Sequence, residues 1–229
     1  MPFGVSANYM ILKEHHKVEE ARLNMGFPIP PINNIGDVEA NVQNYAVRAD
    51  AWLLPFLDVF VLGGYTKGDA ELDLPLELKA QAAMMGLAFP GSVDFEGPTY
   101  GGGLLVAGGY KELFTAVEVN YTDTDLNLLN TDVRTWVVDP RVGWRHACSP
   151  GVVGSIWVGA MYQECQETFH GQVGLGGSPV RFSVDQSSKE PWNVTLGTRW
   201  ELNNNWSIMA EAGGLADRKQ LTVSLGSRF

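Results

Sequence analysis

The sequence predicts an all-β protein, a single antiparallel up-and-down β-barrel of about ten strands, with eight to twelve allowed. Most of the 229 residues alternate apolar and polar side chains with period two, as half-buried strands do. The chain also contains 26 Gly, 12 Pro, seven Trp and seven Tyr, a composition that interrupts helices and favours pleated sheets. Without a linker or a sequence repeat, residues 1–229 are expected to form one domain.

The first half of the chain is expected to contribute five strands. Residues 44–53 place apolar side chains from Tyr45 to Leu53 on one face and polar side chains on the other. Residues 113–124 repeat this arrangement. Weaker alternation predicts three more strands, at residues 4–12, 58–66 and 100–110.

The second half is expected to contribute the other five. Residues 134–145 and 192–202 alternate throughout, although Pro140 in the first of them removes one ladder hydrogen bond. The clearest period-two pattern lies in residues 220–229, where one face is apolar and the other polar. Weaker alternation predicts strands at residues 154–163 and 206–215.

The connections between these strands alternate in length. Short turns are expected at residues 54–57, 111–112, 146–151 and 203–205. Between them lie connections at residues 16–40, 69–98, 125–132, 168–190 and 216–219, all but the last longer than the turns. The expected strand number is even, and both termini lie at the end of the barrel that has the short turns. This is the architecture of an outer-membrane barrel, with short periplasmic turns and long extracellular loops.

Aromatic side chains indicate that the apolar face points outward into lipid. Trp136 and Trp144, like Trp192 and Trp200, are eight residues apart, which at ~3.3 Å per residue and ~40° tilt spans roughly 20 Å of membrane. A soluble lipocalin-like binding barrel, the alternative, would bury this face. The predicted membrane-interface aromatics form two rings and are Tyr45, Tyr65, Tyr100, Tyr110, Tyr121, Trp136, Trp144, Tyr162, Trp192, Trp200, Trp206 and Phe229.

The last nine residues, 221–229, resemble the closing strand of Gram-negative outer-membrane β-barrel proteins. Leu221, Val223, Leu225 and Phe229 match that family's alternating apolar pattern and terminal aromatic residue, whereas Ser227 departs from it. The resemblance implies a bacterial outer-membrane location and contact with outer-membrane lipid and lipopolysaccharide. It also implies recognition of the C-terminal strand by the barrel-assembly machinery.

Charged residues in the polar phase of the strands are expected to line the lumen. There are five arginines and five carboxylates, which predicts a neutral, ion-paired interior, with pairs such as Arg48 with Asp50 or Asp139 with neighbouring arginines. The net charge of -10 then resides mainly in an acidic outer rim and disfavours nucleic acid as a partner. The candidate lumen residues are Arg48, Asp50, Glu118, Asp139, Arg141, Arg199, Glu201 and Glu211, together with Arg145 and Arg228.

Two functions follow, depending on whether the ion pairs close the lumen. An open lumen predicts a narrow, porin-like passive pore for small polar or cationic solutes, and its many inward glycines and alanines leave room for water. A closed lumen predicts a surface scaffold or adhesin that acts through its acidic extracellular loops. The connection 69–98 carries apolar residues near helical spacing, so a short helix is expected there, either in the mouth as a gate or over the rim.

The sequence predicts neither catalysis nor a cofactor. No serine accompanies a histidine at a lipid-facing midpoint, as lipid hydrolysis would require, and the histidines are His15, His16, His146 and His170. The acidic groups at residues 69–73 and 123–125 do not match a calcium loop, and a solvated rim explains them as well as oxygen ligands for Ca²⁺ or Mg²⁺ that bridge to lipopolysaccharide phosphates do. Cys148 and Cys165 are expected not to form a disulfide with each other. Neither an export signal nor a transmembrane helix is visible in the sequence.

Overall fold

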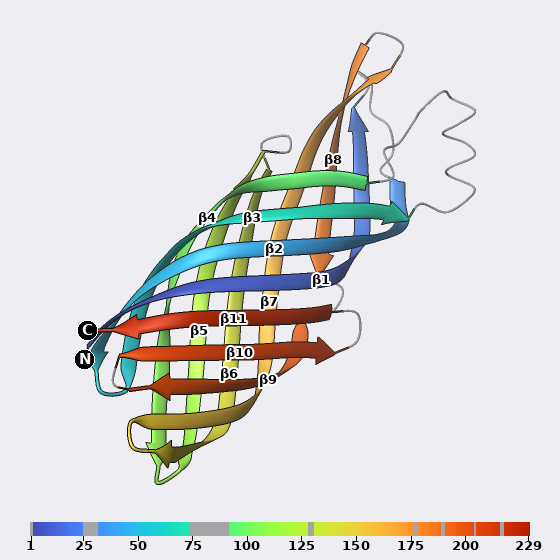
Figure 1. Ribbon diagram of the computed structural model, residues 1–229. Coiled ribbons are helices and arrows are strands. Elements are labelled where there is room, and N and C mark those ends of the chain that lie inside the picture. Colours follow the sequence, from blue (N-terminus) through green and yellow to red (C-terminus); the bar gives the residue numbers. More distant parts are fainter. Residues whose placement is uncertain are drawn as a thin grey trace.

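A computed structural model describes residues 2–24, 32–73, 92–127, 131–175, 178–188, 191–203, 205–215 and 218–229. This part of the chain is all β, as predicted (Figure 1). No helix among these residues is both long and apolar enough to cross a bilayer. The strands are β1 (Phe3–Asn24), β2 (Ile32–Leu54), β3 (Leu57–Asp73), β4 (Ser92–Tyr110), β5 (Leu113–Leu126), β6 (Thr131–Ser149), β7 (Val152–Leu175), β8 (Ser178–Ser188), β9 (Trp192–Leu202), β10 (Trp206–Leu215) and β11 (Arg218–Arg228).

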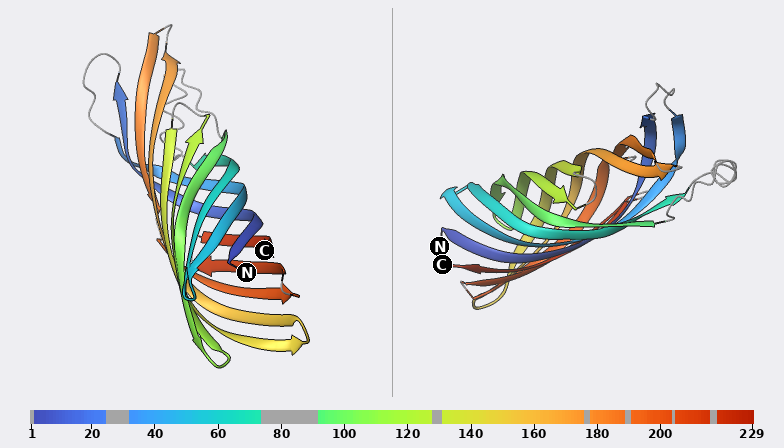
Figure 2. Two further views of the ribbon diagram at one scale, coloured as in Figure 1. Left: turned by 90° about the vertical axis from the view of Figure 1, so that its left-hand side faces the viewer. Right: turned by 90° about the horizontal axis from the view of Figure 1, so that it is seen from above.

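Ten of these strands form a closed antiparallel barrel. Each pairs with the next along the chain, except that the lower part of β7 pairs with β9. The barrel closes where β1 pairs with β11, from Gly4 opposite Arg228 to Lys13 opposite Lys219. Backbone hydrogen bonds between Phe3 and Phe229 tie the two ends of the chain together, and Figure 2 shows these ends side by side. The predicted up-and-down barrel is therefore confirmed.

Strand β8 belongs to an upper tier of the wall. It pairs with the upper part of β7, from Glu167 to Leu175, and with the upper part of β1, from His16 to Asn24. Above the β10–β11 hairpin, β8 thus takes the place of β9, β10 and β11 between β7 and β1. Figure 1 shows β7 and β8 rising beyond the ends of β10 and β11.

Several strands extend beyond their predicted ends. β1 and β2 continue through much of the predicted connection 16–40, and β7 and β8 occupy most of 168–190. Ladder pairing with neighbouring strands satisfies the backbone groups of these extensions. The predicted helix in connection 69–98 lies largely outside the described residues, since its flanks are strand and residues 74–91 are not described.

The short turns lie at the end of the barrel that carries both termini, as expected (Figure 1). Gly151 has φ 79°, and Lys111 and Asn203 have φ 58° and 59°, the left-handed conformation that tight hairpins need. Pro140 lies within β6, and the β6–β7 ladder skips from Val138 to Arg141. This interruption is the expected consequence of the missing proline N–H.

The two faces of the wall differ as a membrane barrel requires. On the outside, Leu196 and Val61 are 67% and 65% exposed, whereas on the inside Asp139 and Glu211 are 1% and 4% exposed. A soluble barrel would show the opposite distribution because it must bury its apolar side chains. The lipocalin-like alternative is therefore wrong, and the chain has the architecture of an outer-membrane β-barrel whose outer wall contacts lipid.

Candidate functional site: a charged layer inside the barrel

The predicted interface aromatics lie on the outer wall at two heights. Within the upper ring, Tyr121 and Trp136 are paired across β5 and β6 with ring centroids 5.0 Å apart. Tyr162 and Trp192 are paired across β7 and β9 at 5.2 Å. Ring contacts of this kind cover the strand ends with amphipathic side chains. Tyr121 and Tyr162 are half-buried, and ten are exposed: Tyr45, Tyr65, Tyr100, Tyr110, Trp136, Trp144, Trp192, Trp200, Trp206 and Phe229.

Tyr9 belongs beside this upper ring although it was absent from the predicted set. It stands opposite Tyr45 on the neighbouring strand, with the ring centroids 4.8 Å apart. Tyr9 belongs to the apolar face of the predicted strand 4–12, and this position could have identified it as an outward-facing aromatic residue.

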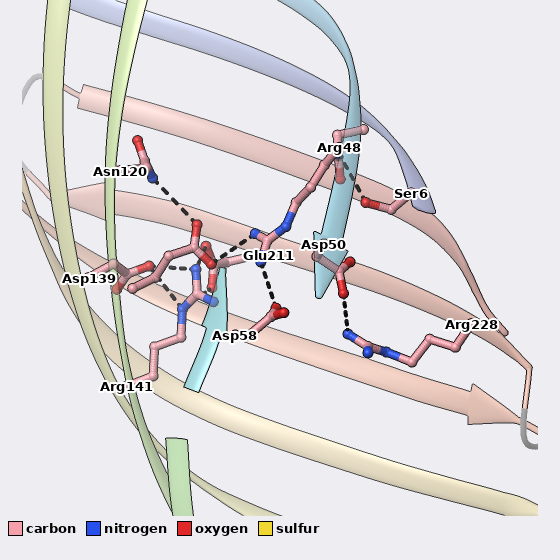
Figure 3. Close-up of polar contacts among 11 residues, drawn as sticks. Ser6, Arg48, Asp50, Asp58, Asn120, Asp139, Arg141, Glu211 and Arg228 are labelled. Carbon is pink, nitrogen blue, oxygen red and sulfur yellow. Dashed lines mark hydrogen bonds and ion pairs between the residues drawn. The ribbon is translucent and has the colours of Figure 1, made fainter. Parts of the chain in front are cut away.

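The predicted lumen charges lie on the inner face, and five of them take part in two ion-paired clusters at mid-height or just below it (Figure 3). The first cluster surrounds Arg141 of β6. Its guanidinium lies 2.6 Å from Asp139 Oδ2 and 3.2 Å from Glu211 Oε2 of β10. Glu211 also accepts a hydrogen bond of 2.6 Å from Trp157 Nε1 of β7. These contacts join three strands across the barrel.

The second cluster surrounds Arg48 of β2. Its guanidinium lies 3.3 Å from Asp58 Oδ2 of β3 and 3.2 Å from Glu118 Oε2 of β5. The same group stacks on the Phe60 ring at 3.5 Å from the centroid, a cation–π arrangement. Asn120 donates a hydrogen bond of 3.4 Å to Glu118. We call Arg48, Asp58, Phe60, Glu118, Asp139, Arg141, Trp157 and Glu211 the central layer.

One predicted ion pair is wrong. Arg48 does not pair with Asp50, because Arg48 reaches across to Asp58 and Glu118, and Asp50 instead accepts a bond of 2.7 Å from Arg228 of β11. Two side chains on one strand at spacing two point the same way, and the neighbouring strands offer each a better-directed partner. The expectation that Asp139 pairs with a neighbouring arginine is confirmed.

Three inward charges, Glu14, Asp58 and Arg218, were missed by sequence reasoning. Asp58 was placed at the start of the predicted strand 58–66 but left out of the lumen set, yet it is 1% exposed and belongs to the central layer. Arg218 was assigned to a connection, yet it begins β11 and is buried beside Gln163 and Gln220, which accept its hydrogen bonds. Continuing the period-two phase from Phe60 and from Gln220 places Asp58 and Arg218 on the inner face.

The remaining lumen charges lie nearer the periplasmic end. Arg199 donates a hydrogen bond of 3.2 Å to Ser207, and Arg145 lies 2.7 Å from Glu201 at the rim. Counting Asp58, Glu14 and Arg218, six arginines and seven carboxylates face inward among the described residues. The interior is thus close to neutral, but the central layer alone has two arginines and four carboxylates.

The central layer fills the barrel at its height. Its charged side chains are at most 19% exposed, and Phe60 and Trp157 are 5% and 6% exposed. The Trp157 ring lies against Gly197 of β9, where an added methyl group would overlap the indole. Charged pairs and aromatic rings therefore leave solvent little access through the centre.

Other candidate groups do not assemble into a reactive site in the described part of the chain. His15 lies 3.1 Å from Glu39 at the upper rim, and His146 lies 3.1 Å from Glu112 in the periplasmic turns. The side chains of His16 and His170 lie outside the described residues. Across the residues described, no three His, Cys, Asp or Glu side chains gather as a metal site. Cys148 and Cys165 are not joined to each other by a disulfide, as predicted.

No family model matches the chain. No curated protein matches it in sequence either. Among solved structures, it is similar to the β-domain of the Bordetella autotransporter BrkA, with 12% identity, full coverage of both chains and a TM-score of 0.44. It is also similar to an outer membrane channel from Pseudomonas putida F1, with 11% identity over 100% of this chain and 97% of that one (TM-score 0.40). The Pseudomonas putida toluene transporter TodX is 8% identical over 99% and 88% (TM-score 0.36). Similarities of this size assign neither a family nor a substrate to the chain.

Proposed function

We propose that the protein is a closed outer-membrane barrel that serves as a surface scaffold. The observation that supports this most strongly is the central layer, in which two arginines hold four carboxylates from β3, β5, β6 and β10. Charges taken out of water are tolerated when they are paired and hydrogen-bonded, and such a paired layer is a stable closure. The proposed role includes no catalysis.

Under this proposal, the part of the wall that extends farthest above the membrane binds the partner. β7 continues from Tyr162 to Leu175, which at ~3.3 Å per residue and ~40° tilt rises roughly 30 Å above the upper aromatic ring. β1, β2 and β8 rise beside it. These four strands present a broad sheet outside the membrane, a surface that can add contacts to a partner without any passage through the lumen.

The outward face just above the aromatic ring is acidic. Among the described side chains of this belt, eight are acidic and four are basic, and several form ion pairs, as Lys67 does with Glu96 at 3.1 Å. A partner that docks at this height would carry basic groups or arrive with cations. The acidic residues in this belt are Glu39, Asp69, Glu71, Asp94, Glu96, Asp123, Asp125 and Glu164, and the basic residues are Lys13, Lys67, Arg134 and Lys219.

Efflux from liposomes tests the closed lumen. The refolded protein in vesicles loaded with a small neutral sugar and a small cationic dye is expected to release neither faster than empty vesicles do. Rapid release of both would refute the scaffold proposal and favour a pore. Heat-modifiable migration on gels confirms in parallel that the protein in the vesicles is folded.

A narrow cation pore is the second candidate, and the charge of the central layer favours it. The layer carries two more carboxylates than arginines, a field that attracts cations if its ion pairs open. Under this candidate, Glu118→Gln lowers cation selectivity in planar bilayers, whereas Glu201→Gln at the periplasmic rim changes it less. Equal effects of both substitutions would argue against a selectivity layer at mid-height.

The C-terminal strand is the proposed contact with the barrel-assembly machinery, on the basis of its family resemblance. Phe229 is exposed at the periplasmic end and its backbone pairs with Phe3. Removal of Phe229 is expected to reduce the amount of protein that reaches the outer membrane in cells. Unchanged assembly would show that this chain does not depend on its terminal aromatic residue.

A further inference from the structure

We infer that the barrel binds one monovalent cation of the Na⁺ or K⁺ class in a buried cradle formed by Asp139, Thr195 and the carbonyl oxygen of Pro140. The cradle lies on the inner wall between β6, β7 and β9. The inference goes beyond the proposed function, because the cation could stabilise a scaffold or a pore equally well.

The oxygen atoms of the cradle converge on the space above Gly159 of β7. Gly159 stands opposite Thr195 of β9 and opposite Arg141 of β6. A methyl group added at Gly159 would lie 2.5 Å from Thr195 Oγ1, 2.9 Å from Asp139 Oδ1 and 3.1 Å from the Pro140 oxygen. The absence of a side chain at this position therefore lets three oxygens approach the same point on the inner wall.

The polar groups around this space have no hydrogen-bond partner among the described residues. These groups are Asp139 Oδ1 and Thr195 Oγ1, and both side chains are 1% exposed. Asn193, two residues along β9 on the same face, is also 1% exposed and has unpartnered polar atoms, with its Nδ2 beside Gly213 of β10. Buried polar atoms are nearly always satisfied in folded proteins, so a group of them facing one space points to a bound species.

The charge of the central layer identifies that species as a cation. Arg141 contacts Asp139 through Oδ2 and leaves Oδ1 to the cradle. The layer retains two more carboxylates than arginines, so a positive ion at Oδ1 halves the excess negative charge. A low-dielectric interior makes uncompensated charge costly, which favours uptake of the ion.

The donor set selects a monovalent ion. One carboxylate oxygen, one hydroxyl and one carbonyl supply hard ligands but little negative charge, and the guanidinium of Arg141 stands nearby. Ca²⁺ sites draw on several carboxylates. In the part of the chain that is described, no group of three acidic, histidine or cysteine side chains gathers.

Thermal unfolding of the full chain in detergent micelles tests the site. The melting temperature is expected to rise with the concentration of NaCl or KCl, but not with choline chloride at the same ionic strength, since a ligand of the folded state stabilises it by mass action. Thr195→Val removes the hydroxyl at nearly constant volume and should abolish the difference between the salts. Thr195→Ser keeps the hydroxyl and should preserve it, as should Thr122→Val at an inward position of β5 outside the cradle.

Identical melting in all three salts would overturn the inference, as would a cation effect that survives Thr195→Val. A stability that rises as the pH falls, without dependence on the cation, would overturn it too by showing that a proton neutralises the layer. Should Thr195→Val fail to fold, Tl⁺ soaked into crystals of the unaltered protein gives the same decision. An anomalous peak between Asp139 and Thr195 supports the site, and its absence refutes it.

Discussion

Trp157 shows how one inward side chain satisfies a buried carboxylate. Its Nε1 donates 2.6 Å to Glu211, which is 4% exposed and also contacts Arg141. Trp157→Phe removes the donor and keeps most of the ring, so we expect a loss of about 1–3 kcal/mol in the free energy of unfolding. Urea unfolding followed by circular dichroism measures it. Trp144→Phe, on the outer wall, is the matched control and should change stability by less than about 0.5 kcal/mol.

Gly197 of β9 tests the packing of the Trp157 ring against the neighbouring strand. Any side chain there would overlap the Trp157 ring, whereas Gly63 on the outer wall has nothing within 4 Å of an added methyl group. Gly197→Ala is expected to destabilise the barrel by about 1–3 kcal/mol through overpacking. Gly63→Ala should leave it within about 0.5 kcal/mol. Equal effects in the same urea experiment would mean that Trp157 does not lie against β9.

Glu39, above the membrane, gives a prediction about pH. The hydrogen bond from the Lys13 ammonium holds the pKa of the Glu39 carboxyl below its ordinary value. A carboxyl whose pKa is lower in the folded state stabilises the fold above its ordinary pKa, and this contribution disappears as the pH falls through the lowered value. Lys13→Met should therefore raise the pKa of Glu39, as carboxyl-carbon NMR titration would show. An unchanged pKa of Glu39 in the Lys13→Met variant would show that Lys13 and Glu39 do not form this pair at the rim.

At the scale of the strand, period two predicts best where lipid imposes it. Residues 192–202 form β9 over the predicted range, and β5 extends the prediction 113–124 by only two residues. β1 was predicted over 4–12 but continues to Asn24, because above the aromatic ring water replaces lipid and no longer selects apolar outward residues. β8 was not predicted because residues 168–190 were assigned to a long connection, although Val180, Phe182 and Val184 alternate with polar residues.

Sequence reasoning did not predict strand β8 or its pairing with β1. Cross-linking between these two strands tests the pairing. Lys17 stands opposite Ser187, a spacing within the ~4.4–6.8 Å that a disulfide requires between Cα atoms. With Cys148→Ser and Cys165→Ser, the pair Lys17→Cys and Ser187→Cys should oxidise to an intramolecular disulfide. Lys17→Cys with Arg181→Cys should not, because Arg181 stands opposite Asn24. Cross-linking of both pairs, or of neither, would contradict this register.

At the scale of the whole molecule, the inner and outer faces followed from the sequence, but the partners of the lumen charges did not. The inward position of Arg141 could be read from alternation within β6, whereas its contact with Glu211 depends on how the barrel closes and how far β10 is staggered. Asp58 and Arg218 were missed because they lie within the first two residues of their strands, where the alternating pattern is shortest. Closure of the lumen is therefore a property of the assembled barrel.

Current through single molecules in planar bilayers tests this closure most directly. The unaltered protein is expected to give a silent membrane. Arg141→Ser, which releases Asp139 and Glu211 and removes the large side chain between them, is expected to give discrete cation-selective steps. Steady conductance by the unaltered protein, equal to that of Arg141→Ser, would contradict a lumen closed by its central layer.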